Sequence, residues 1–97
     1  MLIKKALEIN KSVYGEKHYQ TASSYSVLGV LYHDLEDLKK SLEFHSKALE
    51  IRKLVFGDHH VQTANSYLLV ALLYKKLGRE EESRTYALKY KEFKNLK

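Results

Sequence analysis

Lys47-Ala48-Leu49-Glu50-Ile51 is the second copy of a pentapeptide that already stands 42 residues earlier, at positions 5–9. The similarity continues well past the pentapeptide. Of the 21 residues from 5 to 25, 14 are identical to the residue 42 positions later. A fixed period of roughly 20–50 residues is typical of proteins built from stacked structural repeats. The sequence therefore predicts a repeat protein, a class whose extended surfaces serve in binding.

The composition fits one small helical domain. The chain has 97 residues, of which 44% are apolar, with no Pro and only four Gly to interrupt helices. Because Cys is absent, a disulfide framework and a thiolate metal site are excluded. This absence also fits a reducing compartment, so we expect a cytoplasmic protein. No apolar run approaches the roughly 18 residues of a membrane span, and residues 1–5 are too short for a signal peptide.

The net charge is 17 − 12 = +5, and the basic residues are concentrated near the end of the sequence. Residues 84–97 hold five Lys or Arg against the single acid Glu92. Such a segment is a starting point for binding nucleic acid or a membrane surface. We favour a simpler explanation, because acids at 80–82 followed by lysines suit the dipole of one helix. Interleaved exposed aromatic residues for base stacking are also lacking. Neither nucleic acid nor a membrane is therefore expected as a partner.

Apolar residues recur at spacings of three and four, which predicts amphipathic helices. In the segment 18–35 they form one stripe of Ala22, Tyr25, Leu28, Leu31, Tyr32 and Leu35. The predicted helices span residues 1–11, 18–35, 38–56, 60–77 and 79–96, with connections around Gly15, Glu36-Asp37 and Gly57-Asp58-His59. Asp37 is a suitable N-cap, and Gly78 is a suitable C-terminal residue for its helix. No stretch alternates at period two, so no strand is expected.

A longer pattern runs through both copies: a bulky aromatic residue, Leu-Gly, Tyr, and then small-aromatic-small. In the first copy these are Tyr25, Leu28-Gly29, Tyr32, Ser41, Phe44-His45 and Ala48; in the second, Tyr67, Val70-Ala71, Tyr74, Ser83, Tyr86-Ala87 and Tyr90. The pattern resembles the tetratricopeptide repeat, whose usual period is about 34 residues. Ala-Leu-Glu-Ile followed by Gly-x-x-His, each present twice, resembles the longer repeat of kinesin light chains. The resemblance implies an all-α solenoid of antiparallel helix pairs stacked in a right-handed superhelix.

The whole chain, 1–97, is expected to form one such domain. Residues 1–17 match the trailing helix of an incomplete repeat, and residues 18–59 form a complete one. Residues 60–97 form a second repeat, whose last helix resembles a cap because Tyr90 replaces the expected small residue.

Small residues occupy two equivalent places in each repeat: Gly29 and Ala71 on the first helix, Ser41 and Ser83 on the second. A large side chain there would hold the paired helices apart. We therefore expect the closest approach within each pair at these residues.

The histidines have structural explanations that we prefer to metal binding. His59 and His60 lie beside Asp58, but a closed zinc site needs a further ligand. His18 and His60 occupy the same place in the two copies, so we expect each to lie at the N-terminus of a helix and to form a hydrogen bond with the backbone. We interpret His33 and His45 as ordinary polar positions on helices. Neither a metal nor another cofactor is predicted.

Catalysis is not predicted either. The carboxylates at 80–82 and at Glu36-Asp37 fall at expected helix starts, whereas general acid–base catalysis needs carboxylates held in a cleft. The sequence also contains no Gly-rich phosphate loop and no nucleophile motif. An enzyme is therefore not expected.

The helix predicted at 60–77 carries a second apolar stripe beside its core stripe. The resemblance implies that the first helix of each pair lines a concave groove. The predicted groove residues are Ser23, Ser26, Val27, Val30, His33 and Asp34 in the first repeat and Asn65, Leu68, Leu69, Leu72, Lys75 and Lys76 in the second. Known peptide-binding members use Asn, Lys and Arg there, so the Ser, Val and Leu of this chain disfavour a carboxylate clamp. They favour an apolar or amphipathic partner, with an acidic flank near Lys75 and Lys76.

The predicted function is protein–protein interaction, as a scaffold that binds a partner peptide or helix in this groove. Burial of Leu68, Leu69 and Leu72 would contribute about 1.5–3 kcal/mol each before ordering costs. Two alternatives remain open. The second stripe could pack on a neighbouring repeat of a longer array, since about three repeats are usually needed for stability. The chain could also self-associate, for example as a swapped homodimer.

Overall fold

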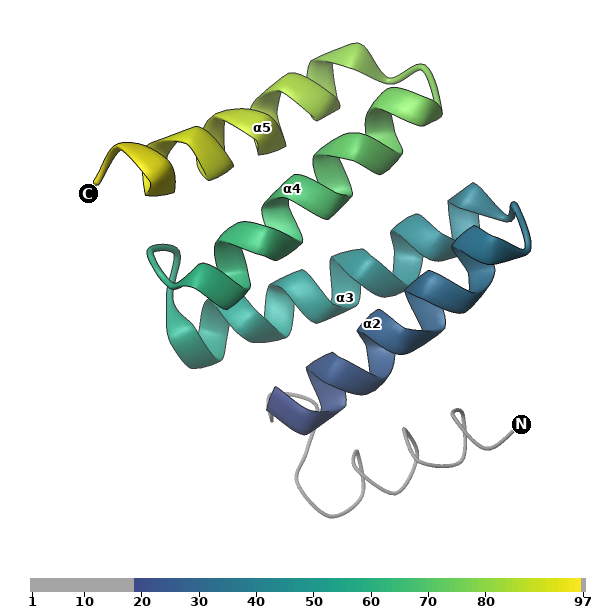
Figure 1. The fold of residues 1–97 in the computed structure, drawn as a ribbon, viewed down its shortest axis with the longest axis horizontal. Coiled ribbons are helices and arrows are strands. Elements are labelled where there is room, and N and C mark those ends of the chain that lie inside the picture. The colour runs from purple at the N-terminus through teal and green to yellow at the C-terminus, as the bar shows by residue number, and fades with distance from the viewer. Residues whose placement is uncertain (1–18, 97) are drawn as a thin grey trace.

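A computed structural model describes residues 19–96, which form four α-helices and contain no strand. The helices are α2 (Tyr19–Asp34), α3 (Leu38–Phe56), α4 (Val61–Lys76) and α5 (Glu80–Asn95), as Figure 1 shows. The bounds of α3 are those predicted, and the other three helices begin and end within one residue of the prediction. The helix predicted at 1–11 and the connection around Gly15 lie outside the described residues. The all-α fold class is confirmed.

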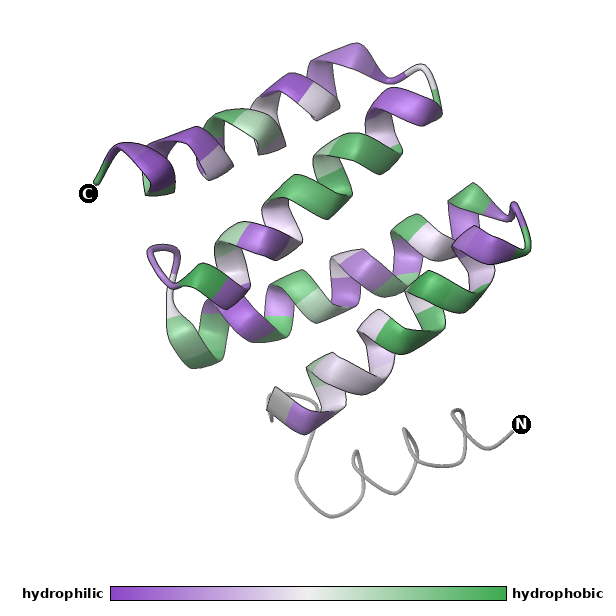
Figure 2. Cartoon of the chain, viewed as in Figure 1, coloured by the Kyte–Doolittle hydropathy of each residue, from purple (hydrophilic) through white to green (hydrophobic). Residues whose placement is uncertain are grey.

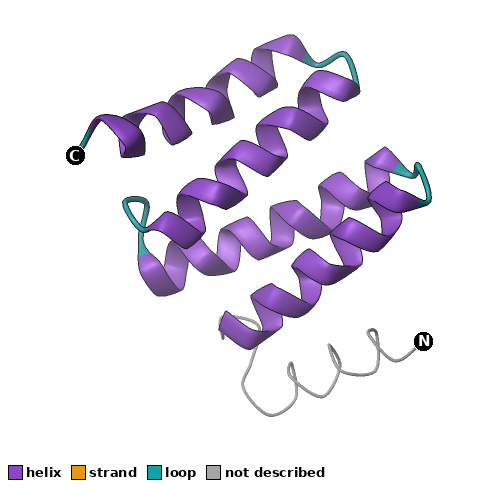
Figure 3. Ribbon diagram, in the orientation of Figure 1, coloured by secondary structure: helices purple, strands orange, loops and turns teal. Residues whose placement is uncertain are grey.

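The helices form two antiparallel hairpins, α2–α3 and α4–α5, joined by short connections (Figure 3). Successive helices pack on one another, so that α3 contacts both α2 and α4. The two leading helices, α2 and α4, have no Cα atoms within 8 Å of each other. Since α3 packs against both of them, it forms the floor of the space between them (Figure 1).

Two helix starts are fixed by side chains that the sequence singles out. The Asp37 carboxylate accepts a hydrogen bond of 3.2 Å from the Lys40 N–H at the start of α3. At the start of α4, Nδ1 of His60 accepts one of 3.0 Å from the Gln62 N–H, and its ring stacks on Phe56. Both groups satisfy a backbone donor that the first helical turn leaves unpaired. The structural role predicted for His60 is confirmed, while its counterpart His18 lies outside the described residues.

The turn inside each hairpin has the same geometry. Gly78 has φ = 78°, and the equivalent Glu36 has φ = 62°. The following N–H of Asp37 or Arg79 donates to the carbonyl of Tyr32 or Tyr74 at 2.9 Å in both turns. Gly adopts this left-handed conformation without steric cost, whereas Glu does so at some expense. The repeat therefore preserves the turn even where the sequence no longer has Gly.

The core consists of two clusters of related design. In the first hairpin, Phe44 stacks between Tyr25 and Tyr32, with ring centroids 6.0 and 5.5 Å away. In the second, Tyr86 lies between Tyr67 and Tyr74, at 6.0 and 5.4 Å. Smaller buried residues complete the clusters: Ala22, Leu28, Ala48 and Ile51 in the first, and Leu49 and Val70 in the second. Leu49 belongs to α3, so the second cluster also joins the two hairpins.

The two helices of each hairpin come into close contact at the small residues. Ser41 Oγ donates a hydrogen bond of 2.7 Å to the Gly29 carbonyl, and Ser83 Oγ donates one of 2.9 Å to the Ala71 carbonyl. Both serines are buried. Because a helical carbonyl already accepts a backbone hydrogen bond, each serine adds a second one across the helix pair. The same contact thus sets the helix separation in both repeats.

Two residues differ from their predicted roles. The sequence predicts Leu35 in the core stripe of the first helix, but Leu35 is exposed, because α2 ends at Asp34 and Leu35 begins the turn. The sequence predicts an ordinary polar position for His45, but His45 is buried, with 4% of its surface exposed. Its ring lies against Gly29, where an added Cβ would come within 2.6 Å of Cδ2 and Nε2.

Replacing Gly29 by Ala tests this close contact. In the wild-type chain, we expect Gly29→Ala to lower the free energy of unfolding by about 1 kcal/mol, because overpacking against His45 outweighs the better helix propensity of Ala. In a His45→Ala background, the same change should raise it by about 1 kcal/mol, since the pair would then be Ala with Ala, as at positions 71 and 87. Urea unfolding of the four proteins measures both effects. An identical effect of Gly29→Ala in the two backgrounds would contradict the contact.

Candidate functional site

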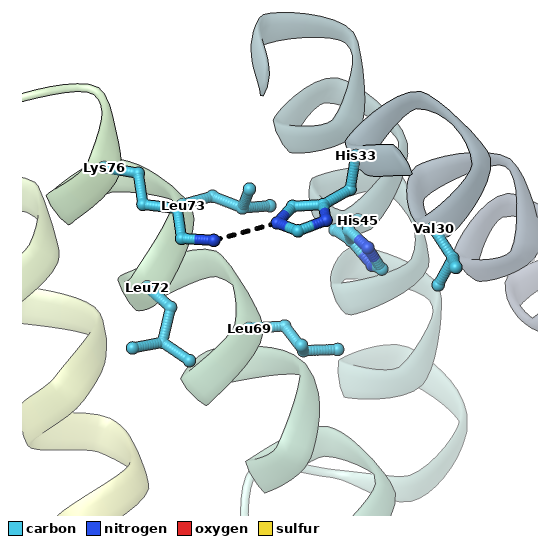
Figure 4. Close-up of a pocket in the computed structure, with 7 residues that line it drawn as sticks. All are labelled: Val30, His33, His45, Leu69, Leu72, Leu73 and Lys76. Atoms are coloured by element: carbon cyan, nitrogen blue, oxygen red, sulfur yellow. Dashed lines mark hydrogen bonds between the residues drawn. The ribbon is translucent and has the colours of Figure 1, made fainter. Parts of the chain in front are cut away.

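A cleft of about 210 Å³ lies between α2 and α4, above α3. Figure 4 shows its lining from all three helices: Val30 and His33 from α2, His45 from α3, and Leu69, Leu72, Leu73 and Lys76 from α4. The four α4 residues recur at spacings of three and four, so they share one face of that helix. The cleft exists because α2 and α4 diverge while both stay packed on α3.

One end of the cleft is polar. Lys76 Nζ lies 2.9 Å from His33 Nε2 and so connects α4 to α2 (Figure 4). An ammonium group can only donate hydrogen bonds, so Nε2 of His33 is the acceptor in this contact. Asp34 and Glu36 line a neighbouring hollow together with the same Lys76 and His33. Both signs of charge therefore meet at this end of the cleft.

His45 forms part of the floor and is held in its uncharged state. Burial lowers the pKa of its imidazole, and the positive charge of Arg52, together with that of His33 whenever His33 is protonated, lowers this pKa further. A neutral imidazole buried against Gly29 contributes a flat, weakly polar surface at neutral pH. Together with the Val and Leu side chains, it makes the cleft predominantly apolar.

Polar contacts at the other end of α3 fix α4 in position. Arg52 donates a hydrogen bond of 2.7 Å from Nη1 to Ser66 Oγ, and its carbonyl accepts one of 3.1 Å from Thr63 Oγ1. The Tyr67 hydroxyl donates to an Asp58 carboxylate oxygen at 2.8 Å, and burial together with this bond raises the pKa of Tyr67. These contacts hold the start of α4 on α3, so the cleft is formed by well-supported helices.

Five of the twelve predicted groove residues line this cleft: Val30, His33, Leu69, Leu72 and Lys76. The other seven lie outside it. Five of these are exposed (Ser23, Val27, Asp34, Asn65 and Lys75), and two, Ser26 and Leu68, are half-buried. Sequence reasoning missed two lining residues, Leu73 and His45. Leu73 follows Leu69 by one helical turn, and His45 faces a Gly where the second repeat has Ala71 and Ala87. Both signals were present in the sequence.

The sequence matches the model of the tetratricopeptide repeat family over residues 1–53 and 28–94, which together cover nearly the whole chain. The chain belongs to the tetratricopeptide repeat family. Tetratricopeptide repeat proteins mediate protein–protein interactions and are generally non-catalytic scaffolds. The finer resemblance to kinesin light chains remains a prediction. No curated protein matches the sequence of this chain.

Two further observations concern the part of this tetratricopeptide chain that the structure describes. Within residues 19–96, no three side chains of His, Cys, Asp or Glu come together as metal ligands would. None of the four described helices combines the length and the apolar character needed to cross a membrane.

The stability of the tetratricopeptide domain should decrease as the pH falls below about 6.5, in part through His45. In the unfolded chain, His45 takes up a proton near its ordinary pKa of 6.5, whereas in the folded chain it does so only at lower pH. Between these two pKa values the unfolded state binds more protons than the folded state. The free energy of unfolding therefore decreases as the pH is lowered.

Urea unfolding of wild type and His45→Gln, at a pH well above 6.5 and at a pH below it, measures this contribution. The variant should lose less stability than wild type over the same interval. An equal loss in the two proteins would show that His45 is not held neutral.

Proposed function

We propose that the chain binds a partner peptide or helix in the groove between α2 and α4, with an apolar side chain of the partner in the cleft. The observation that carries this proposal is the exposure of the cleft walls. Val30, Leu69 and Leu72 are 52%, 40% and 48% exposed on one concave surface. Concave, mostly apolar surfaces with a few polar groups are typical of ligand sites. A cytoplasmic location also remains a prediction, based on the Cys-free composition.

The groove is wider than the cleft itself. Val27, 44% exposed, precedes Val30 by one turn on α2, and the exposed Asn65 precedes Leu69 by one turn on α4. Because about half of Leu69 and Leu72 is already buried, covering the rest would contribute about 1 kcal/mol each. That is less than the sequence alone predicted. An affinity useful to a scaffold therefore requires a partner segment of several residues that extends along both helices.

Charge is expected to set the orientation of the partner more than its affinity. Lys75 and Lys76 favour an acidic flank at the end of α4, as the sequence predicted. Asp34 and Glu36, beside the same end, partly offset this preference. Exposed ion pairs contribute only about 0.2–1 kcal/mol each, so the apolar contacts dominate.

A second copy of the chain is the competing occupant of the groove. It would bury the same leucines, but a two-fold dimer would bring Lys75 and Lys76 of both copies into one interface. The net charge of +5 on each chain opposes that association as well. These charges favour a different partner over self-association.

The experiment uses peptides selected from a displayed library of random linear peptides against the wild-type chain. Leu72→Asp should weaken their binding by about tenfold or more, because it removes an apolar wall and adds a carboxylate that binding would bury. Leu54→Asp is the matched control, since Leu54 is an exposed leucine on α3 that does not line the cleft. It should change the affinity by less than about twofold. Fluorescence polarisation measures both.

Circular dichroism of the two variants accompanies the binding measurement. Both should keep the helix content of wild type. Unfolding of Leu72→Asp would place Leu72 in the core, and equal binding by both variants would place the peptide elsewhere. Either result would contradict the proposed groove.

A further inference from the structure

The second helices of the two hairpins, α3 and α5, differ in what packs on their outer faces. Helix α3 carries a face that receives the next helix: Leu42 and Leu49 pack with Tyr67 and Val70 of α4. Helix α5 is the counterpart of α3, 42 residues later, and its own partner in the hairpin is α4. Among the described residues, no helix packs on the equivalent face of α5. The face is therefore exposed on α5, whereas the equivalent face of α3 packs against α4.

The residues of this face have changed character between the repeats. Arg84 stands at the position of Leu42, and Lys91 stands at the position of Leu49. Ala87 and Leu88 lie between them, and the four residues line a shallow hollow of about 210 Å³. In Figure 2, α5 is largely hydrophilic, whereas the middle of α4 is hydrophobic. We call these four residues the α5 outer face.

The two cationic side chains of the α5 outer face can pair with carboxylates of another molecule. Arg84 and Lys91 are exposed, and within residues 19–96 neither forms an ion pair. Leu88, 59% exposed, follows Arg84 by one turn and precedes Lys91 by one turn. An exposed leucine is thus bracketed by two cations on the same side of the helix.

We propose that the α5 outer face docks an acidic amphipathic helix of a partner protein, in the place that α4 takes on α3. Carboxylates of the partner helix would face Arg84 and Lys91, and an apolar side chain between them would cover Ala87 and Leu88. Such an arrangement pairs each cation and buries the exposed leucine in one contact. This surface is separate from the groove between α2 and α4, so the two proposals stand or fall independently.

Other occupants fit the α5 outer face less well. A helix as apolar as α4 would bury Arg84 and Lys91 without partners, which is costly. A second copy of the chain brings a further net charge of +5 to a basic face. Nucleic acid would use exposed aromatic rings for stacking. Tyr86 and Tyr90 of α5 instead pack against the second core cluster, and nucleic acid would leave Leu88 without an apolar contact.

The probes are two synthetic Ala-rich helical peptides. One carries a Leu bracketed by Glu at the spacing of Arg84, Leu88 and Lys91; the matched peptide has Gln in place of both Glu. We expect the Glu peptide to bind the full chain roughly 2- to 30-fold more tightly, as two exposed ion pairs allow. The difference should shrink as salt is added. Fluorescence anisotropy of labelled peptides measures both affinities.

Charge reversal of the chain makes the test specific. Arg84→Glu/Lys91→Glu should lose the preference for the Glu peptide and prefer a peptide with Lys at the same two positions. Lys39→Glu/Lys89→Glu is the matched control. It changes the net charge equally, through exposed lysines that do not line the hollow, and should keep the preference for Glu. Circular dichroism verifies that both variants are folded.

Three outcomes would overturn the proposal. Equal or undetectable binding of the Glu and Gln peptides would remove the role of the cations. Equal weakening by both double variants would indicate nonspecific attraction to a basic chain. If a single-stranded oligonucleotide binds more tightly than the Glu peptide and loses binding only in Arg84→Glu/Lys91→Glu, the face recognises nucleic acid instead. Steep salt dependence would accompany that last result.

Discussion

The hydrogen bond from Ser41 to the Gly29 carbonyl, repeated by Ser83 and the Ala71 carbonyl, marks the constraint on which the rest of the structure depends. It can form only where two helix backbones come close together, so it requires small residues at both positions. In the first hairpin the His45 ring also lies directly against Gly29. A side chain on Gly29 would displace that ring. The floor of the cleft is therefore set by a packing contact inside the hairpin beneath it.

The two repeats use equivalent positions in different ways. Gly29 and His45 in the first hairpin correspond to Ala71 and Ala87 in the second, so a very small and a large residue stand where the second repeat has two residues of intermediate size. His45 is buried beneath the groove, whereas Ala87 belongs to the α5 outer face. The position of His45 on α3 lies on the floor of the cleft, because α4 packs on α3. The equivalent position on α5, Ala87, lies at the surface, because none of the described helices packs on that face of α5. The two similar helix pairs thus form an apolar groove between α2 and α4 and carry a basic face on α5.

Most of the fold could be predicted from the sequence because helix periodicity and turn chemistry are local properties. The bounds of α3, the cap at Asp37, the role of His60 and the close approach at Ser41 all follow from residue type and spacing. The exposure of Leu35 could not be predicted in this way, because the apolar spacing includes Leu35 although α2 ends at Asp34.

The candidate site was predictable only in outline. Periodicity identifies which face of α4 points away from the core, but it does not determine how far α2 and α4 diverge. The structure places Leu73 in the cleft and Leu68 outside it, although both are leucines on the same helix. His45 was missed because a His on a helix is usually a polar surface residue, and its burial depends on a Gly sixteen positions earlier. Such pairings between helices are non-local and become visible once both helices are placed.

We propose that the groove between α2 and α4 is open to a partner and is not filled by a second copy of the chain. The solution mass, measured by light scattering over a wide range of concentration, tests it most directly. We predict the monomer mass of 11.4 kDa throughout. A dimer that persists on dilution, and that returns to a monomer when Leu72 is replaced by Asp, would contradict this proposal, because a second copy of the chain would then already occupy the groove.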